Sequence, residues 1–147
     1  MRHLFGMPQH VQAVAGRLTK IDVPVDDNAA ITLIYPDRFA VAEASWSQIP
    51  AYHDAVFFGT RATLWTKDGR LFVADESHGE QEIPVEKLPA GEQNGPVYFL
   101  NCLDEDREPG DVCSAAVSRD AQEILEAGLK SNASGRRVAI PLDDDRE

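Results

Sequence analysis

The stretch that decides the fold is residues 26–48, DDNAAITLIYPDRFAVAEASWSQ. Larger and smaller side chains alternate over residues 30–35, and a second two-residue period runs over residues 39–46, which is the pattern of two β-strands. Between them stands Pro36-Asp37, where proline presets the backbone for a tight turn and aspartate is tolerated beside it. The stretch therefore predicts a β-hairpin.

The second strand of this hairpin has no polar side. One side carries Phe39 and Val41, and the other carries alanines at alternate positions and ends in Trp46. An antiparallel sheet that leaves one face to water shows polar residues there, whereas alanine, isoleucine and tryptophan occur here. We expect both faces to be covered, with the alanine-rich strand and Trp46 on an open sheet face that binds another subunit or another domain.

The rest of the chain predicts an α+β fold, an open-faced and mainly antiparallel β-sheet with helices packed on one face. Strand patterns come first and helical patterns late, with hairpins in place of regular strand-helix alternation. The apolar run at residues 55–59 is expected in the middle of the sheet. Asp68-Gly69 predicts a second hairpin because that turn needs positive φ angles. The other expected strands are residues 11–18, 62–65, 71–74, 81–85 (at an edge, because of Pro84) and 137–141.

Two helices are expected in the C-terminal third. The first begins near Pro96, with Phe99, Cys102 and Leu103 on one face. The second begins with Ser118 as its cap and Asp120 in its first turn, and Gly135 ends the region after it. Its expected apolar stripe consists of Ala121, Ile124, Leu125 and Leu129.

Composition bounds the class of protein. A chain of 147 residues with 43% hydrophobic side chains fits one compact domain, expected over residues 1–142, followed by an acidic tail at 143–147. A formal net charge of -11 repels phosphate backbones and anionic lipid, so neither nucleic acid nor a membrane is an expected partner. Two cysteines and no apolar leader favour a soluble protein of the reducing cytoplasm.

Motifs for metal, nucleotide or nucleophile chemistry are absent from the sequence. No pair of histidines or cysteines has metal-ligand spacing, and neither glycine-rich phosphate loop nor G-x-S-x-G occurs, so no metal site, cofactor site or catalytic residue is assigned. Tyr52-His53-Asp54 brings together a phenol, a base and an acid, but chain neighbours usually point apart, whereas catalytic groups converge. The residues considered for metal binding were His3, His10, His53, His78, Cys102 and Cys113.

The order of several short motifs resembles a known family. They are Val25-Asp26-Asp27-Asn28-Ala29-Ala30, Glu43-Ala44-Ser45-Trp46, Phe58-Gly59-Thr60 before Ala62-Thr63-Leu64, Ala121-Gln122-Glu123-Ile124-Leu125-Glu126-Ala127, Ser131, Gly135-Arg136-Arg137-Val138 and Pro141-Leu142. Together they resemble the C-terminal domain of the glucose-fructose oxidoreductase, inositol dehydrogenase and rhizopine-catabolism family (Gfo/Idh/MocA). The likeness runs over nearly the whole chain.

The resemblance implies an NAD(P)-dependent oxidoreductase that acts on sugars or polyols, with a Rossmann domain ahead of the sheet domain. The family's glycine-rich cofactor loop, Glu-Lys-Pro motif and Gly-Gly…Asp…His motif do not occur in these 147 residues. Glu86-Lys87-Leu88-Pro89 imitates the second motif with one residue inserted, but it lies in a polar surface stretch. We therefore expect a truncated chain that is not catalytic alone, with NAD(P) implied only for a full-length relative.

Three hypotheses follow for function. The first is the substrate-side and oligomerisation domain of such an oxidoreductase, with Trp46, Tyr52 and His53 as candidate substrate contacts because strand ends and the loops after them commonly build sites. Core packing is an equal explanation of Trp46. The alternative is a stand-alone, non-catalytic module that binds a protein partner or forms a dimer through the same sheet face. A small independent enzyme around His53 and Asp54 is the third.

Overall fold

The computed structural model describes residues 1–19, 22–50, 53–110 and 113–142. These residues form an α+β fold with two four-stranded antiparallel sheets, so the predicted fold class is confirmed, although the strands divide between two sheets. The chain forms two compact units, residues 1–47 with 95–147, and residues 48–94. The elements are α1 (Arg2–Phe5), β1 (His10–Gly16), β2 (Asn28–Ile34), β3 (Phe39–Ser45), β4 (Val56–Phe58), β5 (Ala62–Lys67), β6 (Arg70–Asp75), β7 (Gln81–Ile83), α2 (Gly95–Asp104), α3 (Ala115–Ser134) and β8 (Val138–Ala139).

The hairpin of residues 26–48 forms one side of the first sheet, with β2 inside the sheet and β3 at its edge. Its strands β2 and β3 pair from Asn28 with Ser45 to Ile34 with Phe39. The turn closes where the amide of Tyr35 donates to the carbonyl of Arg38 at 2.9 Å. Strand β1 pairs along the other side of β2, and β8 pairs with β1, so the sheet order is β3-β2-β1-β8.

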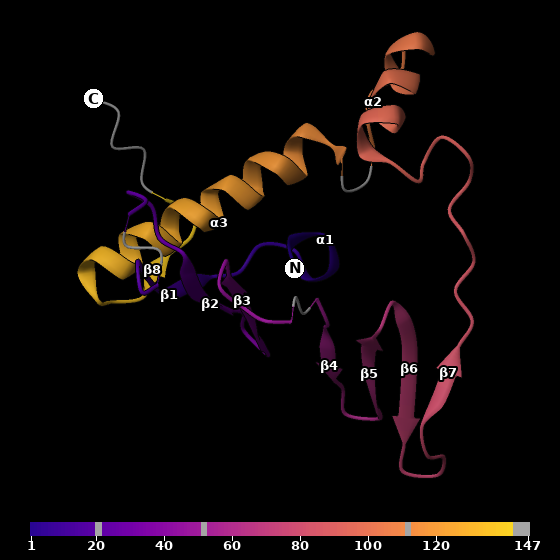
Figure 1. Cartoon of the computed structure of the whole chain (residues 1–147), viewed down its shortest axis with the longest axis horizontal. Helices are drawn as coiled ribbons and strands as arrows, with labels where there is room; N and C mark the ends of the chain where they lie inside the picture. The colour runs from indigo at the N-terminus through magenta and orange to yellow at the C-terminus, as the bar shows by residue number, and fades with distance from the viewer. Residues whose placement is uncertain (20–21, 51–52, 111–112, 143–147) are drawn as a thin grey trace. The chain divides into compact units, whose positions relative to one another are not determined.

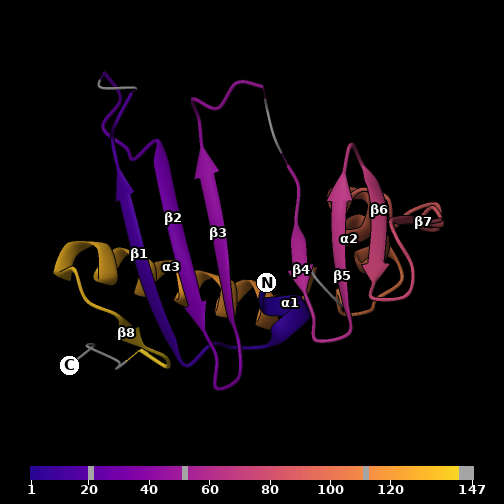
Figure 2. The same ribbon diagram turned by 90° about the horizontal axis from the view of Figure 1, so that it is seen from below.

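Helix α3 covers one face of this sheet, as Figure 1 shows. Figure 2 views the strands from the side opposite the helix. The core between the two layers is a single apolar cluster of buried side chains, Val11, Leu33, Tyr35, Ile124 and Ala127. The core thus joins β1 and β2 to α3.

Ala40 and Ala42 of β3 lie on the face of the sheet on which α3 packs, which corrects the expected assignment of faces. Ala40 pairs with the buried Leu33, and Ala42 pairs with Ile31, which packs on the core. At Gly128 of α3 an added Cβ would come within 3.0 Å of the Ile31 side chain, so helix and sheet approach closely here. The small residues at this approach are Gly128 on α3 and Ala13 on β1, whose Cβ would lie 3.6 Å from the added Cβ, so the close approach of the helix is to β1 and β2.

The opposite face of the first sheet carries larger side chains exposed to solvent. Phe39 is 74% exposed, Val14 is 65% exposed and Val41 is 47% exposed. Cross-strand pairing places Val41 beside Thr32, which pairs in turn with Gln12 on the same face. We call the face that holds Val14, Phe39 and Val41 the open face.

Helix α3 differs from the sequence-based prediction at its start and agrees with it at its end. Ser114 is the N-cap, and its hydroxyl accepts from the amide of Val117 at 3.2 Å, so Ser118 lies inside the first turn and does not cap. Gly135 ends the helix with φ 67°, as expected. The buried stripe is also shifted from the expected one, because Leu125 and Leu129 are exposed. It consists of Asp120, Ile124, Ala127, Gly128 and Ser131.

Helix α2 is present where the sequence places it, but its expected face is only partly buried. Cys102 is buried, whereas Phe99 and Leu103 are exposed, as are Val97 and Leu100. No helix in the described part of the chain is long and apolar enough to cross a membrane.

The second unit is a sheet in the order β4-β5-β6-β7. Asp68 and Gly69 turn the β5–β6 hairpin with φ of 51° and 72°, as expected. Strand β4 lies at an edge, which corrects the expected central position of residues 55–59, and β7 is the expected second edge. The apolar run at β4 misled the prediction because a buried strand and an apolar edge strand have the same composition. Within this unit the ring of Trp65 stacks on that of Phe72 at 5.8 Å.

Candidate functional site

Three chain segments meet at one end of the first sheet. Because β1, β2 and β3 are antiparallel, the last residue of β1 and the last residue of β3 both lie opposite Asn28, the first residue of β2. The residue just before Asn28 is Asp27, which is 2% exposed. The pattern of strands therefore places a buried carboxylate between two strand ends.

The main chain of Asp27 extends both strand pairs by one residue. Its amide donates to the carbonyl of Gly16 at 3.1 Å, and its carbonyl accepts from the amide of Trp46 at 2.9 Å. Trp46 comes directly after β3. The backbone of Trp46 is therefore tied to β2 although it lies outside the regular strand.

From residues that the structure describes, the carboxylate of Asp27 accepts four hydrogen bonds. One oxygen accepts from the amide of Leu18 at 2.8 Å and from the side-chain amide of Asn28 at 2.8 Å. The other accepts from the amide of Thr19 at 2.9 Å and from the Thr19 hydroxyl at 2.7 Å. Hydrogen bonds to both carboxylate oxygens offset the desolvation cost of burying this charge.

The indole of Trp46 is 63% exposed, in contrast to its fixed backbone. Core packing, the alternative explanation from the sequence, therefore does not describe this residue in the chain as given. The following residue, Ser47, has its hydroxyl in contact with that of Thr19, and its amide donates to the Ser45 hydroxyl at 3.1 Å. An exposed aromatic ring on an ordered strand end is suited to contact with a ligand.

The sequence also predicts Tyr52 and His53 as contact residues. Tyr52 lies outside the described residues. His53 is exposed and belongs to the second unit, whereas Trp46 belongs to the first. The assignment of all three as substrate contacts stays a prediction.

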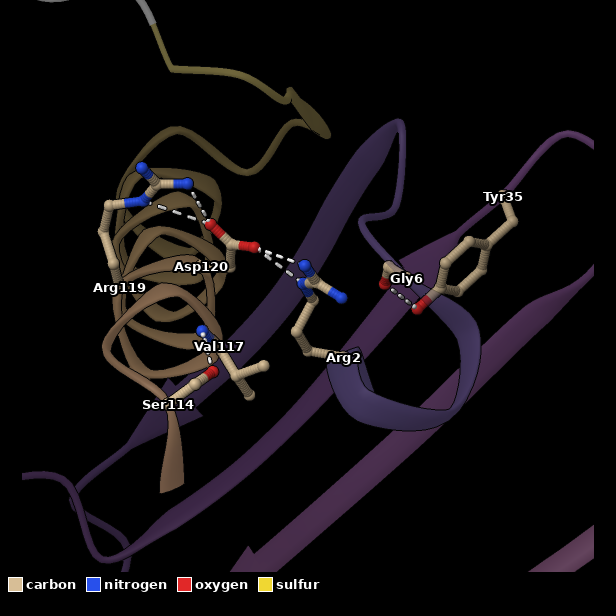
Figure 3. Close-up of polar contacts among 7 residues, drawn as sticks. All are labelled: Arg2, Gly6, Tyr35, Ser114, Val117, Arg119 and Asp120. Carbon is tan, nitrogen blue, oxygen red and sulfur yellow. Dashed lines mark hydrogen bonds and ion pairs between the residues drawn. The ribbon is translucent and has the colours of Figure 1, made fainter. Parts of the chain in front are cut away.

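A second buried carboxylate, Asp120 on α3, lies between two guanidinium groups (Figure 3). Arg119 donates to one carboxylate oxygen at 2.6 Å, and Arg2 donates to the other at 2.7 Å. The hydrogen bonds from Arg119 and from Arg2 hold the pKa of Asp120 below its usual range. The ion pair between Arg2 and Asp120 joins α1 to α3. Next to α1, the Tyr35 hydroxyl donates a hydrogen bond to the carbonyl of Gly6.

Sequence reasoning missed the roles of Asp27 and Asp120. Both were noted, Asp27 as part of a family motif and Asp120 as an acid near a helix start. The signal that was available for Asp120 is its position four residues before the buried Ile124, which puts it on the core-facing side of the helix. Asp27 gives no such signal, because its donors come from a loop whose path the sequence does not reveal.

Other reactive groups are dispersed. Within the described ranges, no three His, Cys, Asp or Glu side chains gather in a way that would hold a metal ion. Cys102 is buried and Cys113 is half-buried, and both are free thiols. Glu86-Lys87-Leu88-Pro89 follows β7 outside any helix or strand, and all four residues are exposed.

Comparison with known proteins adds a family and a fold. Residues 1–65 match the family model of the GFO/IDH/MocA C-terminal domain. No curated protein matches the chain.

Solved structures match over nearly the whole chain. A proposed oxidoreductase from Klebsiella pneumoniae is 17% identical with a TM-score of 0.73, over 98% of this chain and 47% of that one. The WlbA dehydrogenase from Bordetella pertussis, solved with NADH and UDP-GlcNAcA, is 20% identical with a TM-score of 0.67, over 95% and 42%. A proposed myo-inositol dehydrogenase from Sinorhizobium meliloti is 17% identical with a TM-score of 0.63, over 95% and 46%. The chain thus shares their fold and spans less than half of their length.

Proposed function

Because residues 1–65 of this chain match the family model of the GFO/IDH/MocA C-terminal domain, we propose that it is the substrate-side and oligomerisation domain of an NAD(P)-dependent oxidoreductase of sugars or polyols. The observation that carries the proposal is that this family match agrees with the fold comparison. The structure from Klebsiella pneumoniae aligns with 98% of this chain, and the aligned part is less than half of that chain. The WlbA structure, with its bound NADH and sugar nucleotide, supports the proposed chemistry by analogy.

The proposal assigns the chemical step to a part of the enzyme other than these 147 residues. Hydride transfer needs a nicotinamide held against the substrate and a positioned proton donor. The sequence has no glycine-rich cofactor loop. The contribution of this chain is a wall of the substrate site, with Trp46 as the first candidate contact, and a surface for assembly. The cytoplasm stays the compartment that the sequence predicts.

Titration of the 147-residue chain with NADH and NADPH tests this division of roles. We expect no change in nicotinamide fluorescence at cofactor concentrations that saturate the WlbA dehydrogenase, which serves as the positive control. Micromolar binding by this chain would overturn the proposal, because it would require a cofactor site that the family places in another domain.

The open face is the proposed assembly surface. Val14, Phe39 and Val41 place exposed apolar side chains on β1 and β3, away from α3. Exposed apolar patches on a folded domain commonly mark sites of association. A C2 dimer would cover the same patch on both copies, since such an interface is self-complementary.

Sedimentation velocity of charge variants tests the assembly surface. Phe39→Asp combined with Val41→Asp is expected to shift the chain to monomer at concentrations at which the unmodified chain self-associates. Leu125→Asp combined with Leu129→Asp is the matched control, since it places the same charge on exposed apolar positions of α3. A strict monomer before any substitution would remove the self-association half and leave the alternative of a module that binds a different protein.

A further inference from the structure

Asp27 stands out among the buried polar groups because it connects three segments. In the part of the chain that the structure describes, the buried polar or charged side chains are Asp27, Asp120 and Ser131. Asp120 joins two helices and Ser131 bonds a strand. Asp27 instead forms hydrogen bonds that link the ends of β1 and β3 to the start of β2, next to the exposed Trp46.

The contacts of Asp27 reach Trp46 along two routes. The direct route is the hydrogen bond from the Trp46 amide to the Asp27 carbonyl at 2.9 Å. The second runs from the carboxylate to the Thr19 hydroxyl at 2.7 Å, and from that hydroxyl to the hydroxyl of Ser47, the residue after Trp46. Both sides of the Trp46 backbone are therefore held from one buried residue.

Trp46 has no burial of its own that would keep it in place. A side chain that is 63% exposed gains little from packing, so the orientation of its ring depends on the backbone that carries it. Loops at strand ends move on the nanosecond scale unless hydrogen bonds fix them. Fixing such a backbone with a buried charge costs desolvation, which is offset here by four donors.

We propose that Asp27 is a positioning residue that holds Trp46 at the end of the first sheet as a fixed aromatic contact for the ligand of this domain. That a ligand is contacted there rests on the proposed function above. The positioning itself does not, because it concerns only the mobility of Trp46. Asp27 touches no ligand in this account and acts through the backbone of its neighbour.

The mobility of Trp46 can be measured in a chain with a single tryptophan. Trp65→Phe removes the only other tryptophan and keeps an aromatic ring against Phe72. In this background, Asp27→Asn is expected to lower the fluorescence anisotropy of Trp46 and to enlarge the sub-nanosecond component of its anisotropy decay. The substitution replaces one acceptor oxygen by an amide nitrogen, which cannot accept hydrogen bonds from the N–H donors around it. Acrylamide should also quench Trp46 more strongly.

Two matched variants separate positioning from a general loss of stability. Asp26→Asn changes the exposed neighbouring carboxylate. Asp120→Asn weakens the same unit at the other buried carboxylate and should lower the thermal midpoint while Trp46 anisotropy stays unchanged. An anisotropy that falls equally in Asp120→Asn, or that does not fall in Asp27→Asn, would overturn the proposal.

The measurement stays decisive if Asp27→Asn does not fold, as judged by far-ultraviolet circular dichroism. Thr19→Val removes the hydroxyl that joins the carboxylate to Ser47 and keeps Asp27, and it should give a smaller fall in the anisotropy of Trp46. No fall in Thr19→Val would then overturn the proposal. Since no cofactor or substrate enters, failure here is distinct from failure of the NADH and sedimentation tests.

Discussion

At the scale of single residues, polar side chains on α3 complete the backbone hydrogen bonding of β1. Strand β8 pairs only with His10 and Val11, so the edge of β1 beyond them has no strand partner among the described residues. The Ser131 hydroxyl accepts from the amide of Ala13 at 3.0 Å, and Asn132 accepts from the amide of Ala15 at 2.9 Å. A buried serine in an apolar stripe is thereby explained.

Replacement of Ser131 by alanine should destabilise the first unit. The partly buried amide of Ala13 would lose its acceptor, which costs up to about 3 kcal/mol. Urea unfolding followed by circular dichroism measures the change. Ser134→Ala is the control, because that hydroxyl is exposed and donates to the carbonyl of Lys130, and it should change the unfolding free energy little. Equal effects of both substitutions would contradict this account of Ser131.

Asp120 makes the stability of the first unit dependent on pH. Its pKa is lowered on folding by Arg119 and Arg2, so its stabilisation is complete above the unfolded pKa near ~4 and is lost as pH falls through the lower folded pKa. Asp120→Asn should therefore unfold at a lower temperature than the unmodified chain at pH 6, and the difference should shrink below about pH 4. Thermal unfolding between pH 6 and pH 2 measures it, with the exposed Glu126→Gln as control. A difference that is constant with pH would contradict ionic stabilisation.

At the scale of elements, local signals and packing decide different properties. The two hairpins follow from turn residues, since Pro36-Asp37 and Asp68-Gly69 act within four residues of chain. The start of α3 does not follow in the same way, because Ser114 and Ser118 are both acceptable caps by type. Ser114 is selected because the helix extends one turn further toward its N-terminus than its apolar periodicity indicates.

The two serines give a paired test of the helix start. Ser114→Ala should cost about 1 kcal/mol, because the amide of Val117 loses its side-chain acceptor. Ser118→Ala should be neutral or stabilise by up to about 0.5 kcal/mol, since alanine is the better helix former inside a helix. Unfolding free energies of the two variants provide the measurement. The reverse order would restore Ser118 as the cap.

At the scale of the whole molecule, the two units differ in what each one buries. The first has a core cluster shared between sheet and helix. In the second, over the described residues of 48–94, Phe72 is the buried apolar side chain, and no helix belongs to that unit. Hydrophobic burial is the main term that opposes chain entropy, so the second unit has less to hold it folded.

Hydrogen exchange should separate the units. Amides of β1 and β2 are expected to exchange much more slowly than those of β5 and β6, although both pairs are regular antiparallel hydrogen-bonded ladders. Mass spectrometry of peptides from the two hairpins measures the difference. Equal protection would contradict the expectation and would show that another surface covers the second sheet.

Local patterns in the sequence are enough to predict the elements and the likeness to a family. Alternation and turn residues act locally, so the hairpins, the α+β class and the C-terminal helices were predicted from residues alone. The likeness to the GFO/IDH/MocA C-terminal domain was recognised from the order of short motifs and is confirmed over residues 1–65.

Only the tertiary structure decided which faces are covered and which polar residues hold the strand ends. An alternating strand does not state which of its sides meets a helix, and the side of β3 that carries Ala40 and Ala42 proved to be on the face of the sheet where α3 packs. Asp27 became informative for the same reason, since its donors lie on Leu18 and Thr19, about nine residues away in the chain and adjacent only after folding. The hairpin of residues 26–48 is thus local in origin, whereas the position of Trp46 at its end is a product of packing.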